Sequence, residues 1–319
     1  MGYVLPSNTI WRLFNVKALI LVDRLNWAYH SIALACKKYN TSKHLKIDII
    51  HIKGNVKKIK KIYKKYDLFF VMGWQTYNLV NFLPKSATLT GLHSFHSWDD
   101  RRTTPDTDVT PPDHLVEFLN SFKGVNAVSL RLTSLFKKSG VKNIHYTPNG
   151  VDTDIFKNYR KLPLDDTLTV GYSGSKSHDW RKGVTEFIKP AAKKSNVKIK
   201  IAMRHSGDYV PLEQMYKFYN SIDCYICASQ SEGMSLSVLE AAACGRPIIG
   251  TRVSGNVDII KDGMTGFLIN RDVESISKKI EILKETSILK KMSNAIEADI
   301  IKNWCWSYRA KSWIDFIKQ

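Results

Sequence analysis

The chain has 319 residues, with 48 Lys and Arg against 29 Asp and Glu, a formal net charge of +19, and 44% hydrophobic residues. A chain of this length and apolar content can bury a core without disulfides, which excludes disordered and collagen-like proteins. Its longest apolar runs, residues 18–22 and 68–73, are far shorter than the roughly 20 residues that span a bilayer. No signal-peptide pattern follows Met1, and the five cysteines lie mostly in apolar segments, so a cytoplasmic protein is expected.

Short apolar runs alternate with helical patterns in the first half of the chain, which is typical of parallel βαβ construction. The predicted strands are residues 16–22, 46–52, 67–72, 87–92, 125–129 and 143–146. Helices are predicted over 27–39 and 55–66, where apolar residues recur at helical spacing. Residues 97–114 are dense in Pro, Thr and charge, which predicts a long loop.

A second series of strands begins after Pro148, Asn149 and Gly150, which interrupt the pattern and mark a domain boundary. Strands are predicted at 168–172, 197–203, 223–228, 247–251 and 266–269, and helices after residue 273. The expected fold class is α/β, with two Rossmann-like, doubly wound domains over residues 1–148 and 149–300. Two such domains facing one another would hold a ligand in a cleft at the carboxyl ends of their strands.

The positive charge is concentrated in the first half. Residues 1–150 contain 22 Lys and Arg against 9 Asp and Glu, whereas residues 151–319 contain 26 against 20. Within 53–65, Val56, Ile59 and Ile62 recur every three residues among seven lysines, which predicts an amphipathic basic helix. Such a surface indicates an anionic partner such as nucleic acid, anionic lipid or a phosphorylated ligand. Lysine enrichment from genome composition and simple solvation are the alternative explanations.

Residues 231–247 carry the strongest chemical signal. A predicted strand leads into a Ser- and Gly-rich loop that contains Glu232, and then into a short helix that contains Glu240 and ends at Gly245. Backbone N–H groups and a helix N-terminus at the edge of a sheet form an anion site, and both carboxylates can face it. Ser237 and Glu240 also fit an S-x-x-E capping box, which is the structural alternative for Glu240.

Glu232 and Glu240 have the spacing of the E-x7-E segment, and the chain here resembles the retaining GT-B glycosyltransferases of family 4, the glycosyl transferases group 1. Further segments match the family in order, namely residues 147–152, 181–183, 218–223 and 258–268. The match covers about residues 145–270, and the first half matches loosely through Asp23, Trp27 and His93. The resemblance implies a GT-B fold in which residues 301–319 form a helix that packs back on the first domain. It also implies a nucleoside-diphosphate sugar donor, with a UDP-sugar expected, and neither a metal nor another cofactor.

The resemblance also implies a role for each matching residue. The implied catalytic residues are Glu232, Lys182 and His93. Glu232 would bind hydroxyls of the donor sugar, Lys182 would neutralise the diphosphate, and Glu240 would hold the ribose hydroxyls. The further donor-binding positions are Gly233, Met234, Ser235, Gly174, Arg181 and Lys176. Tyr172 and Ser173 stand where the family usually has an arginine, so the second diphosphate cation is expected to be Arg181 or Lys176.

The residues define the acceptor less closely than the donor. The candidate acceptor residues are Trp27, Asp99, Lys57, Lys58, Lys61 and Arg101. The basic first half favours DNA with a hydroxylated base, as in viral DNA glucosylation, as the acceptor. The alternatives are a cell-surface glycan or lipid-linked acceptor at an anionic membrane, and a non-catalytic protein that binds nucleotide sugars or DNA. Cys224 and Cys227 are expected in the core, because no second Cys/His pair has metal-ligand spacing.

Overall fold

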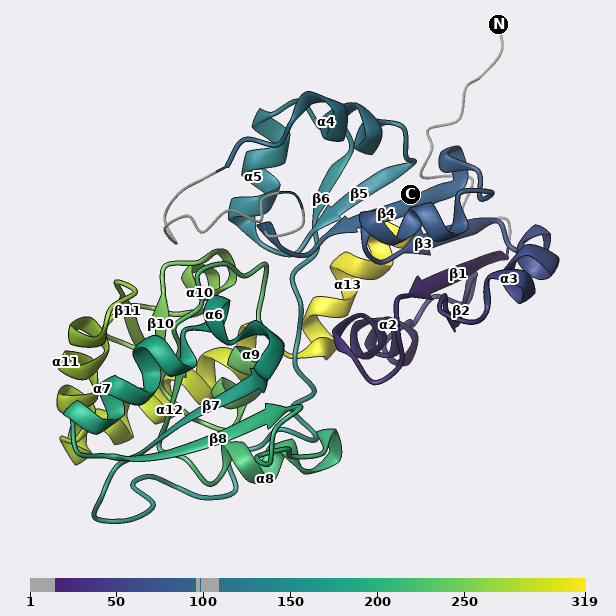
Figure 1. Cartoon of the computed structure of the whole chain (residues 1–319). Helices are drawn as coiled ribbons and strands as arrows, with labels where there is room; N and C mark the ends of the chain where they lie inside the picture. Colours follow the sequence, from purple (N-terminus) through teal and green to yellow (C-terminus); the bar gives the residue numbers. More distant parts are fainter. Residues whose placement is uncertain (1–14, 96–97, 99–108) are drawn as a thin grey trace, which may run out of the picture. The chain divides into compact units, whose positions relative to one another are not determined.

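The computed structural model describes residues 15–95, 98 and 109–319, and these divide into two compact units (Figure 1). The described part of the first unit comprises residues 15–95, 98, 109–149 and 306–319. The second unit comprises residues 150–305. Most of the predicted long loop, including Asp99 and Arg101, lies outside the described residues.

The first unit contains a parallel sheet of six strands in the order β2-β1-β3-β4-β5-β6. The strands are β1 (Val16–Val22), β2 (Leu45–His51), β3 (Leu68–Val71), β4 (Thr88–Leu92), β5 (Gly124–Ala127) and β6 (Ile144–Tyr146). The helices are α2 (Ala28–Lys38), α3 (Val56–Ile62), α4 (Asp113–Asn120) and α5 (Leu130–Lys138), with 3-10 turns at Tyr63–Lys65, Trp74–Val80 and Lys85–Ala87. Each predicted strand is present, with bounds shifted by up to two residues.

Helix α3 has the predicted amphipathic character. Ile59 is fully buried against the sheet, and Val56 and Tyr63 pack beside it in the same apolar cluster. The lysines between and directly after these positions are exposed, namely Lys57, Lys58, Lys60, Lys61, Lys64 and Lys65. The helix ends earlier than predicted and tightens into a 3-10 turn, in which the Tyr66 N–H donates to the Tyr63 carbonyl oxygen at 2.9 Å.

The last helix, α13 (Trp306–Ile317), is part of the first unit and contacts α2. Trp313 is fully buried, and its indole Nε1 donates to the Pro148 carbonyl oxygen at 2.8 Å. Its ring packs near Phe70 of β3, while Phe316 meets the same phenylalanine edge-on. The C-terminal aromatic residues therefore complete the core of the first unit.

The second unit contains a parallel sheet of five strands in the order β11-β10-β9-β7-β8. The strands are β7 (Thr169–Ser175), β8 (Lys198–Arg204), β9 (Cys224–Cys227), β10 (Ile248–Thr251) and β11 (Gly266–Ile269). The helices are α6 (Asp179–Lys182), α7 (Lys189–Lys194), α8 (Met215–Tyr219), α9 (Leu236–Ala243), α10 (Ser254–Ile259), α11 (Val273–Leu283) and α12 (Thr286–Asn303), with a π-helical turn at Val184–Ile188 and 3-10 turns at Lys176–His178 and Leu212–Gln214. The predicted α/β class with two doubly wound sheets is confirmed.

One face of this second sheet is covered by the π-helical turn, α7 and α11, whose apolar side chains meet Val170, Cys224 and Ile249. Cys224 and Cys227 are both buried, as the sequence predicted. Strand β7 continues to Ser175, three residues beyond the predicted end, because it pairs with β8 along its whole length. The glycine-rich residues 171–175 are therefore a paired strand.

Candidate functional site

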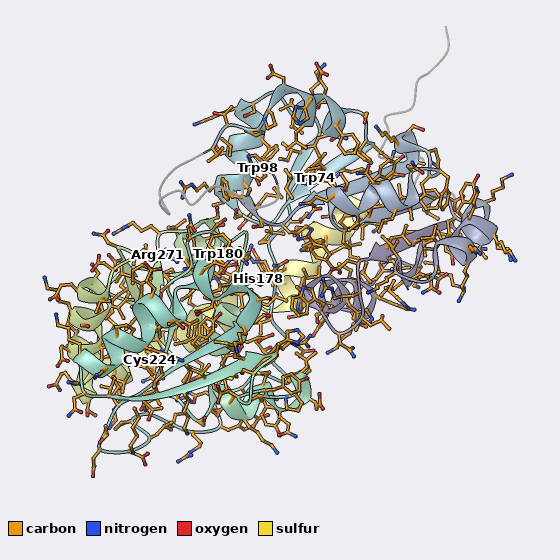
Figure 2. All side chains as sticks on the ribbon, viewed as in Figure 1. Trp74, Trp98, His178, Trp180, Cys224 and Arg271 are labelled. Atoms are coloured by element: carbon orange, nitrogen blue, oxygen red, sulfur yellow. The ribbon has the colours of Figure 1, made fainter. Side chains whose placement is uncertain are left out.

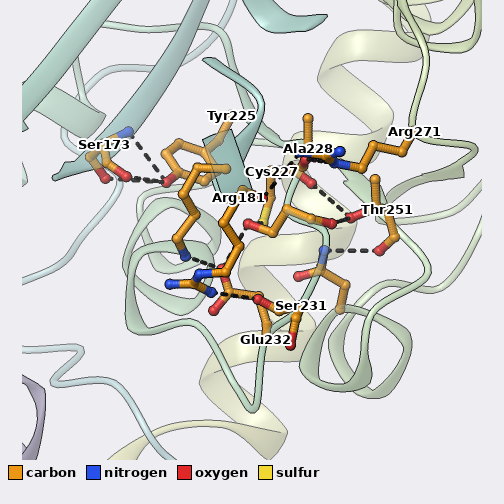
Figure 3. A network of polar contacts seen from close by, with 12 residues as sticks. Ser173, Arg181, Tyr225, Cys227, Ala228, Ser231, Glu232, Thr251 and Arg271 are labelled. Carbon is orange, nitrogen blue, oxygen red and sulfur yellow. Dashed lines mark hydrogen bonds and ion pairs between the residues drawn. The ribbon is translucent and has the colours of Figure 1, made fainter. Parts of the chain in front are cut away.

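The candidate site lies in the second unit at the carboxyl end of β9, where residues 228–235 meet the turn that ends α6 (Figure 3). Helix α6 ends at Gly183, whose φ of 69° lies in the left-handed region that favours glycine. A Cβ at this position would come within 3.0 Å of the Ala228 carbonyl oxygen. Glycine therefore allows the turn to approach the end of β9 closely.

Lys182 and Glu232 form an ion pair here, in which Nζ of the lysine donates a hydrogen bond to Oε1 of the glutamate. The Lys182 side chain is 17% exposed and the Glu232 side chain 11%, so the pair is largely withdrawn from water. The Ser229 hydroxyl donates to the same carboxylate oxygen at 2.7 Å. Burial alone would raise the pKa of Glu232, but Lys182, Arg181 and Ser229 outweigh it and lower that pKa, which favours the ionised form.

Arg181 adds a second positive charge beside this pair. Its Nη1 donates to the Ser231 carbonyl oxygen at 2.7 Å, and the Arg181 carbonyl oxygen accepts from the Gln230 N–H at 2.8 Å. Its Nε is buried and has no hydrogen-bond partner among the residues that the structure describes. Its charge helps to lower the pKa of Glu232, and it opposes the burial that raises the pKa of Tyr172.

Arg271 fastens the α6 turn to the loop after β9. Its Nε donates to the Ala228 carbonyl oxygen at 3.0 Å, and its Nη2 donates to the Trp180 carbonyl oxygen at 2.8 Å. Figure 2 shows Arg271 and Trp180 side by side on the second unit. Sequence reasoning missed Arg271, because any residue offers a carbonyl oxygen and no pattern marks the accepting positions.

Glu240 lies inside α9, and its carboxylate is held by Tyr219, whose hydroxyl donates to Oε2 at 2.8 Å. Burial raises the pKa of Glu240 to about 7, against the hydrogen bond from Tyr219, which lowers it. The residue as a whole is only partly buried. The capping-box alternative is wrong, because α9 begins after Ser235 and Ser237 is already within the helix.

The loop residues between the two glutamates are tightly held. Gly233 and Met234 are buried, and Ser235 is the residue that precedes α9. Helix α10 packs against this loop at Gly255, where a Cβ would meet the Met234 Cα at 2.5 Å. Of the remaining candidates, Lys176 is exposed, and Gly174 lies in β7 where a Cβ would meet the Tyr172 hydroxyl at 2.0 Å.

The predicted residues of the first unit lie on other elements. His93 follows β4, with its ring 4.6 Å from that of Tyr29 and 6.1 Å from that of Trp313. Burial lowers the pKa of His93 to about 3, although a backbone interaction with Met72 opposes the change, so the imidazole is neutral at physiological pH. Trp27 precedes α2, with the Arg24 guanidinium 4.9 Å above its ring.

Residues 205–300 match the family model described as Glycosyl transferases group 1. The chain is 28% identical over 169 residues to a trehalose synthase of Pyrococcus horikoshii, covering 51% of this chain and 40% of that protein. It is 30% identical over 149 residues to the capsular polysaccharide biosynthesis glycosyltransferase CapM of Staphylococcus aureus, covering 39% and 38%. The resemblance to group 1 glycosyltransferases is confirmed. The chain thus spans about two fifths of the length of these relatives.

Solved structures establish the GT-B fold. Sucrose-phosphate synthase from Thermosynechococcus elongatus aligns with a TM-score of 0.73 at 15% identity, over 94% of this chain and 97% of that one. Anabaena HepE in complex with UDP-glucose aligns with a TM-score of 0.71 at 14% identity, over 94% and 98%. Of the two predicted glutamates, Glu232 lies in the loop after β9 and Glu240 lies in α9.

Over residues 15–95, 98 and 109–319, no group of three or more His, Cys, Asp or Glu side chains could hold a metal ion. Among the helices of the same ranges, none has both the length and the apolar composition needed to cross a membrane.

Proposed function

We propose that this protein is a retaining glycosyltransferase whose second unit binds a nucleoside-diphosphate sugar, with a UDP-sugar as the expected donor. The observation that carries the proposal is the shielded Lys182–Glu232 ion pair at the end of β9, with the charge of Arg181 beside it. CapM is named as a glycosyltransferase, and solved structures of HepE contain UDP or UDP-glucose, which supports this donor class.

Each charged group then has a distinct task. Glu232 accepts hydrogen bonds from hydroxyls of the donor sugar, because its lowered pKa keeps the carboxylate an acceptor. Lys182 and Arg181 neutralise the diphosphate, and Arg181 is preferred over Lys176 as the second cation because its charge acts on Glu232. Glu240 accepts hydrogen bonds from the ribose hydroxyls.

The proposed reaction needs no protein base. The bond between the anomeric carbon and the diphosphate oxygen breaks, and the acceptor oxygen bonds to the same face of that carbon. The acceptor proton passes to the departing diphosphate oxygen. Lys182 stabilises the negative charge that grows on the diphosphate, which is the interaction that strengthens in the transition state. His93 would take part as a neutral hydrogen-bonding group, because its pKa is about 3.

The test of the donor proposal is incubation of the purified protein with a panel of labelled nucleotide sugars. Release of the free nucleoside diphosphate from one of them, with slow transfer to water, is the expected result. A protein that binds UDP but neither hydrolyses nor transfers any sugar of the panel would instead support the non-catalytic alternative. A protein that binds no nucleotide of the panel would contradict the proposal.

The acceptor proposed here is anionic, with modified DNA as the first candidate. The lysines on the exposed side of α3 carry the argument: among the described residues, none of Lys57, Lys58, Lys61 or Lys65 forms an ion pair with a carboxylate. A dense row of uncompensated charge attracts phosphates. The name of CapM favours the other candidate, a glycan acceptor made at a membrane surface.

Replacing Lys57, Lys58, Lys61 and Lys65 with Gln is expected to weaken DNA binding and to flatten its salt dependence. Each lost phosphate contact removes about 0.7–0.9 from the slope of log K against log salt, because fewer counterions are released on binding. Donor hydrolysis without acceptor should stay unchanged, since Lys182 and Glu232 are in the other unit. Titration of labelled duplex and single-stranded DNA over a salt series measures the effect.

The matched control replaces Lys189, Lys290, Lys291 and Lys302, four exposed lysines of the second unit, with Gln. It removes the same charge and should leave the slope near the wild-type value. Loss of binding to anionic vesicles in the α3 variant, with no DNA affinity in the wild type, would favour the membrane-surface acceptor. Wild-type protein that binds neither DNA nor vesicles at low salt would rule out both acceptors.

A further inference from the structure

Three hydroxyl groups form a buried chain behind Glu240. The Tyr219 hydroxyl, which holds Oε2 of Glu240, lies 3.0 Å from Oγ of Ser173. Ser173 lies in β7, and its Oγ is 3.2 Å from the hydroxyl of Tyr225 in β9. Tyr219 is fully buried, Tyr225 is 2% exposed and Ser173 is 7% exposed. Figure 3 shows the Ser173 and Tyr225 part of this chain.

The single hydrogen on each hydroxyl fixes the direction of donation along this row of hydroxyl groups. Each hydroxyl has one hydrogen, and an ionised carboxylate only accepts. The Tyr219 hydrogen is directed to Glu240, so the Tyr219 oxygen must accept from Oγ of Ser173. With its own hydrogen used, Oγ of Ser173 can accept only from the Tyr225 hydroxyl at 3.2 Å. That hydroxyl hydrogen is shared with the Ser173 carbonyl oxygen at 3.1 Å, and the Tyr225 oxygen accepts from the Ser173 N–H at 3.3 Å. Each link polarises the next toward the carboxylate.

Oε1, the second carboxylate oxygen of Glu240, is not held in the way that Oε2 is. In the described part of the chain, the only hydrogen bond to the Glu240 carboxylate is the one from Tyr219 to Oε2. Oε1 therefore retains its full capacity to accept, in a residue that is only partly buried. Tyr219 therefore fixes Oε2 of Glu240 and leaves Oε1 available to accept from a ligand.

We propose that Tyr219, backed by Ser173 and Tyr225, is a positioning residue that orients the Glu240 carboxylate so that Oε1 meets the ribose of the nucleotide. The inference rests on the proposed function, because it takes Glu240 as the ribose-binding group. Tyr219 acts through Glu240 and does not itself touch the donor. It adds a determinant of nucleotide affinity that lies outside the E-x7-E segment.

The surroundings of Glu240 make the effect of Tyr219 on nucleotide affinity depend on pH. The titratable groups that act on it or respond to it are Tyr219 from α8 and Cys244 at the end of α9. From α12, which packs against α9, Glu297 acts on Cys244 and Arg246. No cation compensates Glu240 within the described residues, so the Tyr219 hydroxyl is the one group that lowers its pKa there. Removing that hydroxyl therefore favours the protonated carboxyl, which is a weaker acceptor for the ribose hydroxyls than the carboxylate.

The test is isothermal titration of UDP, which carries the ribose, into the wild type and the Tyr219→Phe variant at pH 7 and pH 9. Hydrogen bonds to charged groups are the stronger class, so a roughly tenfold rise in Kd at pH 7 is expected. The difference should narrow at pH 9, where Glu240 is ionised in both proteins. Ser173→Ala should change Kd in the same direction by a smaller factor.

Tyr216→Phe is the matched control, because Tyr216 lies on the same helix and its hydroxyl makes no hydrogen bond in the described structure. It should bind UDP as the wild type does at both pH values. A Tyr219→Phe variant with a lower Tm but a wild-type Kd at both pH values would overturn the inference and leave Tyr219 a purely structural residue.

UDP binding by a Glu240→Gln variant distinguishes failure of the inference from failure of the proposed function. If Glu240→Gln loses UDP affinity while Tyr219→Phe keeps it at both pH values, the positioning role fails and the proposed ribose contact stands. If Glu240→Gln binds UDP as tightly as the wild type, the ribose contact fails and the positioning role fails with it. A wild type that binds no UDP would overturn both.

Discussion

Replacing Lys182 with Ala is expected to lower turnover of the nucleotide-sugar donor by roughly 100- to 1000-fold, with a smaller change in KM. The lysine is held by Glu232 in a largely buried ion pair, so its charge is already oriented before the donor arrives. That charge is needed most when the sugar–phosphate bond breaks, because negative charge then accumulates on the diphosphate. Initial-rate kinetics of donor hydrolysis, with kcat and KM determined separately, measure the effect.

The same substitution should also reduce stability, because it leaves the Glu232 carboxylate buried without its partner. Breaking a buried pair costs about 3–5 kcal/mol, and the exposed fraction of these side chains lowers that figure. A double variant, Lys182→Ala with Glu232→Gln, should recover stability without recovering turnover. Lys189→Ala, which removes an exposed lysine of the same unit, is the control. A folded Lys182→Ala protein with full kcat would remove Lys182 from the mechanism.

Replacing Glu240 with Gln is expected to weaken UDP binding at least tenfold and, at the same time, to stabilise the protein at alkaline pH. The pKa of Glu240 is about 7 in the folded chain, whereas an unfolded glutamate titrates near about 4.3. The folded state therefore holds the proton more tightly. The stability that this protonated group contributes is complete below about pH 4.3 and is lost as the pH rises through 7. Glutamine does not ionise, so the variant avoids that loss.

At pH 8 the variant should be more stable than the wild type by at most roughly 4 kcal/mol, and by less because Glu240 is only partly buried. Urea unfolding at pH 5 and pH 8, beside titration of UDP, measures both effects. Glu213→Gln, at an exposed glutamate of the same unit, should change neither. A Glu240→Gln variant that loses stability at both pH values and binds UDP normally would show a structural role instead.

The order of strands and the place of the site follow from local patterns. Strand β1 occupies the predicted residues 16–22, because five successive apolar side chains there are buried on both faces of a parallel sheet. The E-x7-E glutamates could be found because both lie in one short segment with its own loop and helix signals. Strand β7 was predicted too short, since its glycines resemble a loop until the pairing with β8 is known.

The sequence by itself determined the α/β class, the amphipathic character of α3 and the two glutamates of the candidate site, because each depends on residues that are close together along the chain. Only the tertiary structure decided that Lys182 pairs with Glu232, fifty positions away, and that Tyr219 holds Glu240. It alone showed that Arg271 fastens the α6 turn through backbone carbonyls, 43 and 91 positions away. The physical reason is that such contacts depend on how distant strands and turns meet, and backbone acceptors leave no trace in residue type.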